Sequence, residues 1–356
     1  MVPDTARKLS EAGISVRVES GLGNTCNFED SEYLDAGAEI IGSREELLKT
    51  ADTVVRLNKP PLDEIGLQRP GTVLISHLEP FSDETLVKRL AESDIRAVSM
   101  ELIPRTTRAQ KMDALSSQAS LGGYVAVIIA AERLDAIFPM MTTPSGTIQP
   151  ARVFIIGAGV AGLQAIATAK RLGARVDAFD TRPVVEEQVR SLGARFVKVD
   201  LGEREERKDG YATELTKEQL EKQRQVMENQ CALSDVVITT AQVFGKKAPL
   251  IITDSMIGKM KPGAVIVDMA VETGGNVEGS ELNREVVRNG VSILGYANLS
   301  GRVPVTASGM YSNNIGNFLI EFWDKENGLL NLDPEDDIIS GCLVTADGKI
   351  VNERLL

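Results

Sequence analysis

The stretch around Gly157 constrains the fold of this chain more than any other part of the sequence. Residues 153–156 are apolar and lead directly into Gly157-Ala158-Gly159-Val160-Ala161-Gly162, after which a helical segment follows. A buried strand, a GxGxxG turn and a helix in this order are typical of a dinucleotide-binding domain. Gly157 permits the tight turn, Gly159 lets a pyrophosphate approach the backbone, and Gly162 allows the helix to pack closely. We therefore predict that these three glycines bind the cofactor, together with Val160 at the helix N-terminus. The alternative is a glycine-rich turn that binds no ligand.

The next predicted strand ends in Asp180, a second candidate for cofactor binding. A carboxylate at this place accepts hydrogen bonds from an adenosine ribose and repels a 2′-phosphate, so it favours NAD(H) over NADP(H). Arg182 lies two residues further on and could weaken this preference by pairing with a phosphate. The alternative interpretation of Asp180 is an ordinary turn carboxylate.

Short apolar runs alternate with helical segments along nearly the whole chain. Strands are expected at residues 16–19, 54–57, 73–76, 97–100, 152–156, 175–180, 195–199, 235–239, 264–268 and 291–294. Apolar strands separated by helices are typical of parallel sheets covered on both faces. We therefore expect an α/β protein with two Rossmann-like parallel-sheet domains, joined by long helices, and an NAD site in the cleft between them.

The domain boundaries follow from helix breakers and from the size of the C-terminal segment. Prolines and a glycine between residues 138 and 150 interrupt the helix expected from Thr107 to about Leu134, so we expect an interdomain connection there. The last fifty residues are too few for a third core, and Asp347-Gly348 predicts a hairpin among them. We expect residues 1–134 and 305–356 to form the first domain and residues 135–304 the Rossmann domain.

Composition excludes several classes of protein. The formal net charge of −12 argues against binding to nucleic acid or to a membrane surface, because both are anionic. Three scattered cysteines and a single histidine are too few for a closed zinc site. The N-terminus lacks the pattern of a signal peptide, and no apolar run without a glycine approaches the ~20 residues of a spanning helix. Direct membrane insertion is therefore not expected.

The segment IPRTTRAQKMDALSS carries the other group of candidate residues. Gln110, Asp113 and Ser116 recur at intervals of three and would share one face of the predicted helix. Such a face could bind a carboxamide and a ribose, while Arg105 reaches a phosphate. The alternative for Gln110 is a capping box with Thr107, which would give it a purely structural role.

Two further features allow more than one interpretation. His77 follows a predicted strand and could act as a general acid or base, but a hydrogen-bonded structural histidine is the more frequent case.

The connection between residues 199 and 235 is longer than the usual ~2–6 residues, and Gly210-Tyr211 could form the tip of a mobile flap. A solvated charged helix is the alternative there.

Three stretches together resemble the soluble NAD(H)-binding component of proton-translocating NAD(P) transhydrogenases, a family related to alanine dehydrogenase. They are GAGVAGLQAIATAKRLGA with AFDTRP, RTTRAQKMDALSSQA, and KMKPGAVIVDMAVETGGN. The resemblance implies that the second stretch contacts the nicotinamide half of the cofactor, through Arg105, Gln110, Asp113 and Ser116, of which the first three would be catalytic. It also implies that Gly157, Gly159, Val160, Gly162 and Asp180 hold the adenosine half, and that Tyr211 belongs to a mobile loop.

The same resemblance implies partners and a reaction. Hydride would pass between NAD(H) on this chain and NADP(H) on a partner subunit, and a membrane-spanning subunit would couple the transfer to proton movement. That step needs alignment of two nicotinamide C4 atoms at roughly 3–3.5 Å and no general acid or base. A homodimer on the cytoplasmic face of the inner membrane, attached through its partners, is expected. Relatives usually open with a strand before the helix that begins here at Pro3, so we expect the natural start to lie upstream of Met1.

Two alternatives to transhydrogenation remain. In alanine dehydrogenase, the catalytic lysine precedes a proline by two residues, and Asn58 occupies that place in Asn58-Lys59-Pro60. This departure from the pattern of alanine dehydrogenase disfavours amino-acid oxidation. A non-catalytic NAD(H)-binding module is the other alternative, which would bind the nucleotide without transferring hydride.

Overall fold

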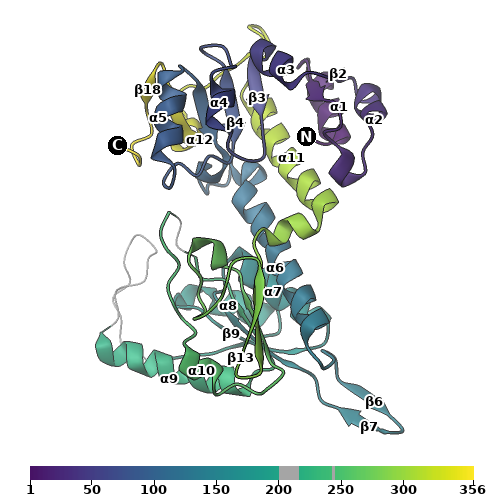
Figure 1. The fold of residues 1–356 in the computed structure, drawn as a ribbon, viewed down its shortest axis with the longest axis vertical. Helices are drawn as coiled ribbons and strands as arrows, with labels where there is room; N and C mark the ends of the chain where they lie inside the picture. The colour runs from purple at the N-terminus through teal and green to yellow at the C-terminus, as the bar shows by residue number, and fades with distance from the viewer. Residues whose placement is uncertain (200–215, 243–244) are drawn as a thin grey trace. The chain divides into compact units, whose positions relative to one another are not determined.

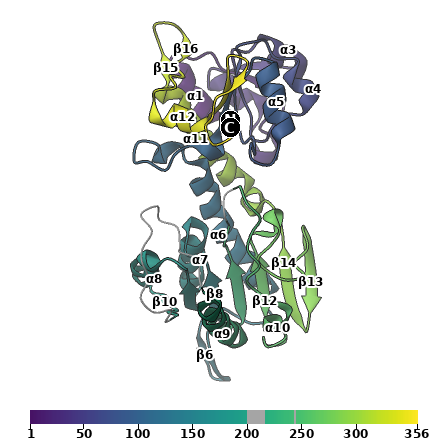
Figure 2. The same ribbon diagram turned by 90° about the vertical axis from the view of Figure 1, so that its left-hand side faces the viewer.

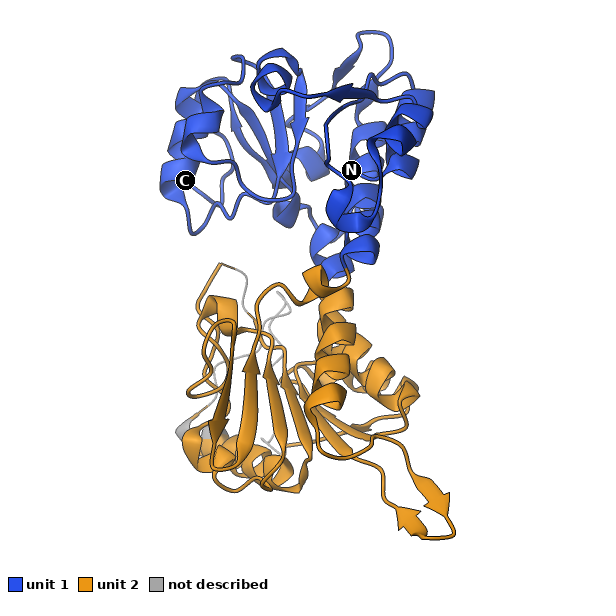
Figure 3. Cartoon of the chain, turned by 45° about the vertical axis from the view of Figure 1, so that its right-hand side comes forward, with its two compact units in different colours: residues 1–118, 304–356 blue, residues 119–303 orange. Residues whose placement is uncertain are grey.

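A computed structural model describes residues 1–199, 216–242 and 245–356 of the chain (Figure 1). Its contacts divide the chain into two compact units, shown in separate colours in Figure 3. Unit 1 comprises residues 1–118 and 304–356, and unit 2 comprises residues 119–303. Both are α/β structures with parallel strands, as the sequence predicted.

Unit 2 is built on a seven-stranded sheet in the order β10-β9-β8-β11-β12-β14-β13. The strands are β8 (Arg152–Ile156), β9 (Arg175–Phe179), β10 (Arg195–Phe196), β11 (Val236–Thr239), β12 (Val265–Asp268), β13 (Arg284–Arg288) and β14 (Val291–Gly295). All run parallel except β13, which pairs antiparallel with β14 at one edge, opposite β10 (Figure 2). The winding reverses between β8 and β11, so their carboxyl ends form the switch point of a doubly wound sheet.

Helices cover both faces of this sheet because its central strands are apolar on both sides. The helices are α6 (Ala114–Arg133), α7 (Val160–Arg171), α8 (Glu186–Ser191), α9 (Lys217–Leu233) and α10 (Asp254–Ile257). Side chains alternate along each strand, so Val153 and Ile155 pack in the core that contains residues of α6 and α7. Phe154 and Ile156 point into the opposite core, which contains residues of α9 and α10.

Unit 1 contains a five-stranded sheet in the order β18-β17-β5-β4-β3. Its strands are β3 (Thr53–Val55), β4 (Val73–Ser76), β5 (Arg96–Ser99), β17 (Leu343–Ala346) and β18 (Lys349–Ile350). The helices include α1 (Pro3–Glu11), α2 (Asp30–Asp35), α3 (Arg44–Thr50), α4 (Leu62–Ile65), α5 (Glu84–Glu92), α11 (Pro304–Glu321) and α12 (Asp337–Cys342). The predicted hairpin is present, because Asp347 and Gly348 take φ of 51° and 73° between β17 and β18. Strand β17 adds antiparallel to β5, so the chain's C-terminal part completes the sheet begun by its first third.

Some expected elements differ from the structure. The strand predicted at residues 16–19 is β1 (Arg17–Glu19), which pairs with the unpredicted β2 (Glu39–Ile41) in a separate small sheet. Residues 138–150 contain an exposed hairpin of β6 (Met141–Thr143) and β7 (Gly146–Ile148) inside unit 2. The breakers indicated correctly that no helix continues there, but they do not distinguish a hairpin turn from a linker. By contacts, the chain passes from one unit to the other inside α6, after Gln118.

Helix α6 differs from the other described helices in its composition. It is long and apolar enough to cross a membrane. A core helix of a soluble protein meets the same two criteria of length and apolar content. Its buried residues Val125, Ala126 and Ala130 belong to a core of unit 2. Core packing therefore accounts for the buried part of this apolar stretch.

We predict that Gly123→Ala lowers the free energy of unfolding by about 1–3 kcal/mol, because α6 and α7 touch at this glycine. A Cβ there would lie 2.1 Å from the carbonyl oxygen of Ala161, a backbone atom that cannot move aside. The matched control is Gly122→Ala, whose Cβ would lie 3.2 Å from the flexible end of Met269. Both changes bring the same gain in helix propensity. Urea unfolding of the two variants that gave equal stabilities would contradict the packing.

Candidate functional site

The glycine turn lies at the carboxyl end of β8, where two of its glycines are required by packing alone. Gly157 has φ +99°, and a Cβ on it would lie 2.5 Å from the hydroxyl of Thr240. That hydroxyl follows β11 and donates a hydrogen bond to the carbonyl of Gly157 at 3.1 Å. A Cβ on Gly162 would lie 1.8 Å from the same carbonyl oxygen. These contacts join β8, β11 and α7 at the switch point of the sheet.

Gly159 differs from the other two glycines because the protein does not crowd it. It is the N-cap of α7, and a Cβ on it would meet no atom within 4 Å. The helix begins at Val160, which is exposed, and a glycine offers no side chain to cap the first N–H groups. Free amides and the positive end of the helix dipole therefore face open space, an arrangement that fits a phosphate group.

Asp180 lies next to this turn, as the sequence predicted from its place after β9. Its Oδ2 accepts the N–H of Ala158 at 2.7 Å, and the Arg182 guanidinium binds both of its oxygens. Burial would raise the pKa of Asp180, but Arg182 and the backbone N–H groups outweigh it, so the pKa lies below its ordinary value. The carboxylate is therefore ionised at neutral pH and is directed at the mouth of the turn. A pocket of about 200 Å³ opens beside it, with Phe179 and Phe196 in its wall.

Two buried polar residues that were not predicted from the sequence fix the loops that follow β11 and β12. Asp268 ends β12, is fully buried, and accepts the N–H groups of Ala270 and Asn276. Asn276 in turn donates to the carbonyls of Ala241 and Pro249 and accepts the N–H of Ala241. The loops after β11 and β12 are thereby joined through side chains. The sequence does contain a signal for these two residues. An aspartate ends an apolar strand, and Gly274-Gly275-Asn276 begins six residues after it.

The segment that carries Arg105 and Gln110 lies in unit 1 and is not the continuous helix expected. Residues Gln110–Met112 form a 3₁₀ turn and α6 begins only at Ala114. The prediction that Gln110, Asp113 and Ser116 share one helical face is therefore wrong, and so is the capping box at Thr107. Asp113 is the cap instead, because its Oδ1 accepts the N–H of Ser116 at 2.8 Å and its Oδ2 the Ser116 hydroxyl.

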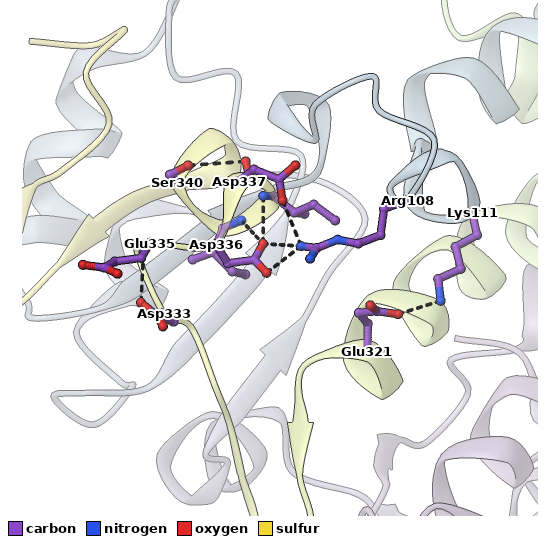
Figure 4. A network of polar contacts seen from close by, with 10 residues as sticks. Arg108, Lys111, Glu321, Asp333, Glu335, Asp336, Asp337 and Ser340 are labelled. Atoms are coloured by element: carbon purple, nitrogen blue, oxygen red, sulfur yellow. Dashed lines mark hydrogen bonds and ion pairs between the residues drawn. The ribbon is translucent and has the colours of Figure 1, made fainter.

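This segment is fixed to two other elements of unit 1 by its cations (Figure 4). Arg108 forms ion pairs with Asp336 and Asp337 at the start of α12, and Lys111 pairs with Glu321 at the end of α11. The side-chain amides of Asn314 and Asn317, both on α11, donate to the carbonyl of Lys111 at 3.0 Å each.

Arg105 and Gln110, by contrast, are exposed, and neither side chain has a polar partner among the residues that the structure describes.

His77 faces a buried carboxylate and an aromatic ring. Its Nδ1 lies 3.5 Å from the buried carboxylate of Glu101, and its ring stacks on Tyr311 at 5.2 Å. Burial raises the pKa of Glu101, but the facing imidazole outweighs it, so that the pKa lies below its ordinary value. Lys59, near the end of β3, forms ion pairs with Glu79 and Asp83.

The predicted site residues form two separate constellations, one in each unit. Unit 2 brings Gly157, Gly159, Val160, Gly162 and Asp180 around one crevice, and unit 1 brings Arg105, Gln110, Asp113 and Ser116 into one anchored segment. Tyr211 and the predicted flap tip lie outside the described residues.

Comparison with known proteins agrees with this architecture. Residues 1–122 match the family model "Alanine dehydrogenase/PNT, N-terminal domain", and residues 126–353 match its C-terminal counterpart. An NAD(P) transhydrogenase alpha-subunit polypeptide of Rhodospirillum rubrum is 44% identical over 99% of this chain and 94% of its own length. A crystal structure of transhydrogenase from Sinorhizobium meliloti superposes with a TM-score of 0.86 at 38% identity, covering 99% of this chain and 94% of that one. Alanine dehydrogenase of Mycolicibacterium smegmatis is more distant, at 27% identity over 100% of this chain and 91% of its own.

We predict that Asp113→Ala lowers the free energy of unfolding by about 1 kcal/mol, because the N–H of Ser116 loses its acceptor. Asp113→Asn keeps an N-cap acceptor and should retain nearly the stability of the unchanged protein. Chemical unfolding of the two variants measures the difference. Equal stabilities of Asp113→Ala and the unchanged protein would mean that the cap contributes nothing to α6.

Proposed function

The chain belongs to the alanine dehydrogenase/PNT family, and from that premise we propose that it is the NAD(H)-binding subunit of an NAD(P) transhydrogenase. In this proposal it binds NAD(H) at the glycine turn of unit 2 and exchanges hydride with NADP(H) on a partner subunit. The relatives support the reaction, since two that are 44% and 41% identical over 99% of this chain are named as the alpha subunit of that enzyme. Family and fold both support NAD(H) as the nucleotide on this chain.

The open space in front of Gly159 is the observation that carries the binding proposal. The protein itself leaves room for a Cβ at this glycine, whereas Gly157 and Gly162 are held by their own packing. The fold itself does not require a glycine at position 159, and the backbone there is open to a pyrophosphate on the free amides of α7. Asp180 would receive the hydroxyls of the adenosine ribose. The bound dinucleotide supplies or accepts the hydride at its nicotinamide.

We assign the nicotinamide half to the anchored segment of unit 1. Arg105 and Gln110 are exposed polar side chains on a segment that ion pairs and amide hydrogen bonds hold in place. Arg105 would bind a phosphate, and Gln110 the carboxamide or the partner's nucleotide. Asp113 and Ser116 bond to each other at the start of α6, so their proposed contacts to the ribose would add to a capping role. Arg105, Gln110 and Asp113 are the residues that we propose act in the transfer.

The chain's own residues do not favour amino-acid oxidation. That reaction needs a lysine or histidine free to move a proton at the substrate. Asn58 stands where alanine dehydrogenase has its catalytic lysine, and Lys59 is engaged by two carboxylates. Hydride exchange between two nicotinamides requires none of these groups.

The assembly follows from the same proposal. The names of the relatives imply further subunits, which would be an NADP(H)-binding beta subunit and a membrane-spanning subunit that couples the reaction to proton translocation. The chain would then be cytoplasmic and attached to the inner membrane only through these partners. We also propose a homodimer, and the exposed apolar side chains Met141 and Ile148 on the β6–β7 hairpin support such an interface.

Gly159→Ala should weaken NADH binding by at least roughly tenfold while leaving the protein folded, because the added methyl group occupies the path of the pyrophosphate. Calorimetry with NADH measures the affinity, and thermal unfolding checks the fold. Gly309→Ala is the matched control, since a Cβ on that glycine also meets nothing within 4 Å but lies in unit 1. If Gly159→Ala bound NADH as tightly as the control, the turn would not be the pyrophosphate site.

The chain alone should oxidise no NADH with an NADP⁺ analogue, and activity should appear when the NADP(H)-binding subunit is added. The reason is that only one dinucleotide-binding turn of this type occurs in the sequence. Absorbance of the reduced analogue follows the reaction. Alanine-dependent NADH formation without any partner would instead assign the chain to the dehydrogenase branch of the family.

A further inference from the structure

The carboxylate of Asp180 is fully engaged in the structure. Its Oδ1 accepts the backbone N–H of Arg182 at 2.8 Å and the Nε–H of the same residue at 3.0 Å. Its Oδ2 accepts the N–H of Ala158 at 2.7 Å and the Arg182 Nη2–H at 2.9 Å. An ionised carboxylate offers about four lone-pair sites. All of them are used, two by backbone amides and two by the guanidinium.

A ribose can bind to this carboxylate only if one set of donors leaves. The backbone amides of Ala158 and Arg182 are fixed by the glycine turn and by the chain, so the guanidinium is the set that can leave. When the guanidinium leaves, one acceptor site becomes free on each carboxylate oxygen of Asp180. A ribose 2′,3′-diol presents two hydroxyl donors on neighbouring carbons, and the two sets are therefore equivalent in number and spacing.

We propose that the Arg182 guanidinium occupies the place of the ribose diol and is exchanged for it when the dinucleotide binds. This inference rests on the proposed function, since it takes the adenosine ribose to be the ligand of Asp180. Arg182 then competes with the ribose for Asp180, and the vacated carboxylate selects the nucleotide. Only a nucleotide with both hydroxyls free can restore the two hydrogen bonds, whereas a 2′-phosphate brings negative charge and no second donor to the carboxylate.

The exposure of the two side chains suits such an exchange. The Asp180 side chain is 7% exposed and the Arg182 side chain 43%. The exposed guanidinium can turn into water, and the ribose diol then replaces the donors that the buried carboxylate loses. The buried carboxylate cannot turn away, and its two backbone hydrogen bonds keep it oriented after the guanidinium has left.

A second pair in the same sheet provides a control. Arg195 binds Asp177 through Nε and Nη2 at 2.7 and 2.9 Å, the same two-point geometry. Asp177 lies inside β9 rather than at its carboxyl end, and it also accepts a hydrogen bond from Gln230. This pair matches the first in chemistry but lies away from the glycine turn.

The exchange predicts that Arg182→Ala binds ADP more tightly than the unchanged protein, by about two- to fivefold, because a competitor for Asp180 is removed. Arg195→Ala should bind ADP with unchanged affinity. Calorimetry on the full chain measures both. Weaker ADP binding by Arg182→Ala would overturn the proposal, since the guanidinium would then contribute to binding.

The Arg182 Nε–H signal in a nitrogen–proton NMR spectrum reports the exchange directly, once it has been assigned by its absence from Arg182→Lys. Saturating ADP should move this signal to the position of a solvent-exposed arginine, and 2′,5′-ADP at the same concentration should not. A signal that stays in place while NADH and ADP bind would overturn the exchange and leave the proposed function intact. Failure of the unchanged protein to bind either nucleotide would overturn the proposed function, and the exchange with it.

Discussion

The close contact between Gly162 and the carbonyl of Gly157 determines where the functional end of unit 2 lies. Because a Cβ at Gly162 would lie 1.8 Å from that oxygen, α7 can begin directly against the end of β8 only with glycine there. Thr240 adds a hydrogen bond from the next strand of the sheet, so that the turn is held from both sides. The first amides of α7 consequently emerge at the switch point between β8 and β11, where an open α/β sheet binds its ligands.

The attraction of this site for an anion does not come from the charge of the protein. The chain carries a net charge of −12 and would repel a dinucleotide at long range. At the turn itself, the positive potential is that of oriented backbone amides, which add no net charge and act over the first turn of the helix. The nearby cation, Arg182, is neutralised by Asp180. In the proposed function, selectivity would therefore arise from local geometry, in which an ionised carboxylate and a helix N-terminus lie on either side of Ala158.

Local patterns in the sequence predicted this half of the site, because each of its residues follows an apolar strand at a fixed place. The strands of the parallel sheet, the three glycines and Asp180 were all found in this way. The same method failed for residues 107–116, where the spacing suggested one helical face. Asp113 competes for the backbone as an N-cap, and the chain before it forms a 3₁₀ turn. The positions of β2 and β13, and the bonds from Asn276 to residues 35 and 27 positions earlier, depend on long-range contacts that no local pattern contains.

The segment before α6 can still be distinguished from an ordinary surface loop. Arg108 and Lys111 reach two different helices, and Asn314 and Asn317 converge on one carbonyl. Each of these contacts costs side-chain entropy and lies partly in water, where it contributes little stability. Fixing a segment in this way is useful when its position matters more than its stability. Arg105 and Gln110 are side chains that the fixed segment leaves free, and in the proposed function the contacts around them would present these two residues to the nicotinamide half of the cofactor.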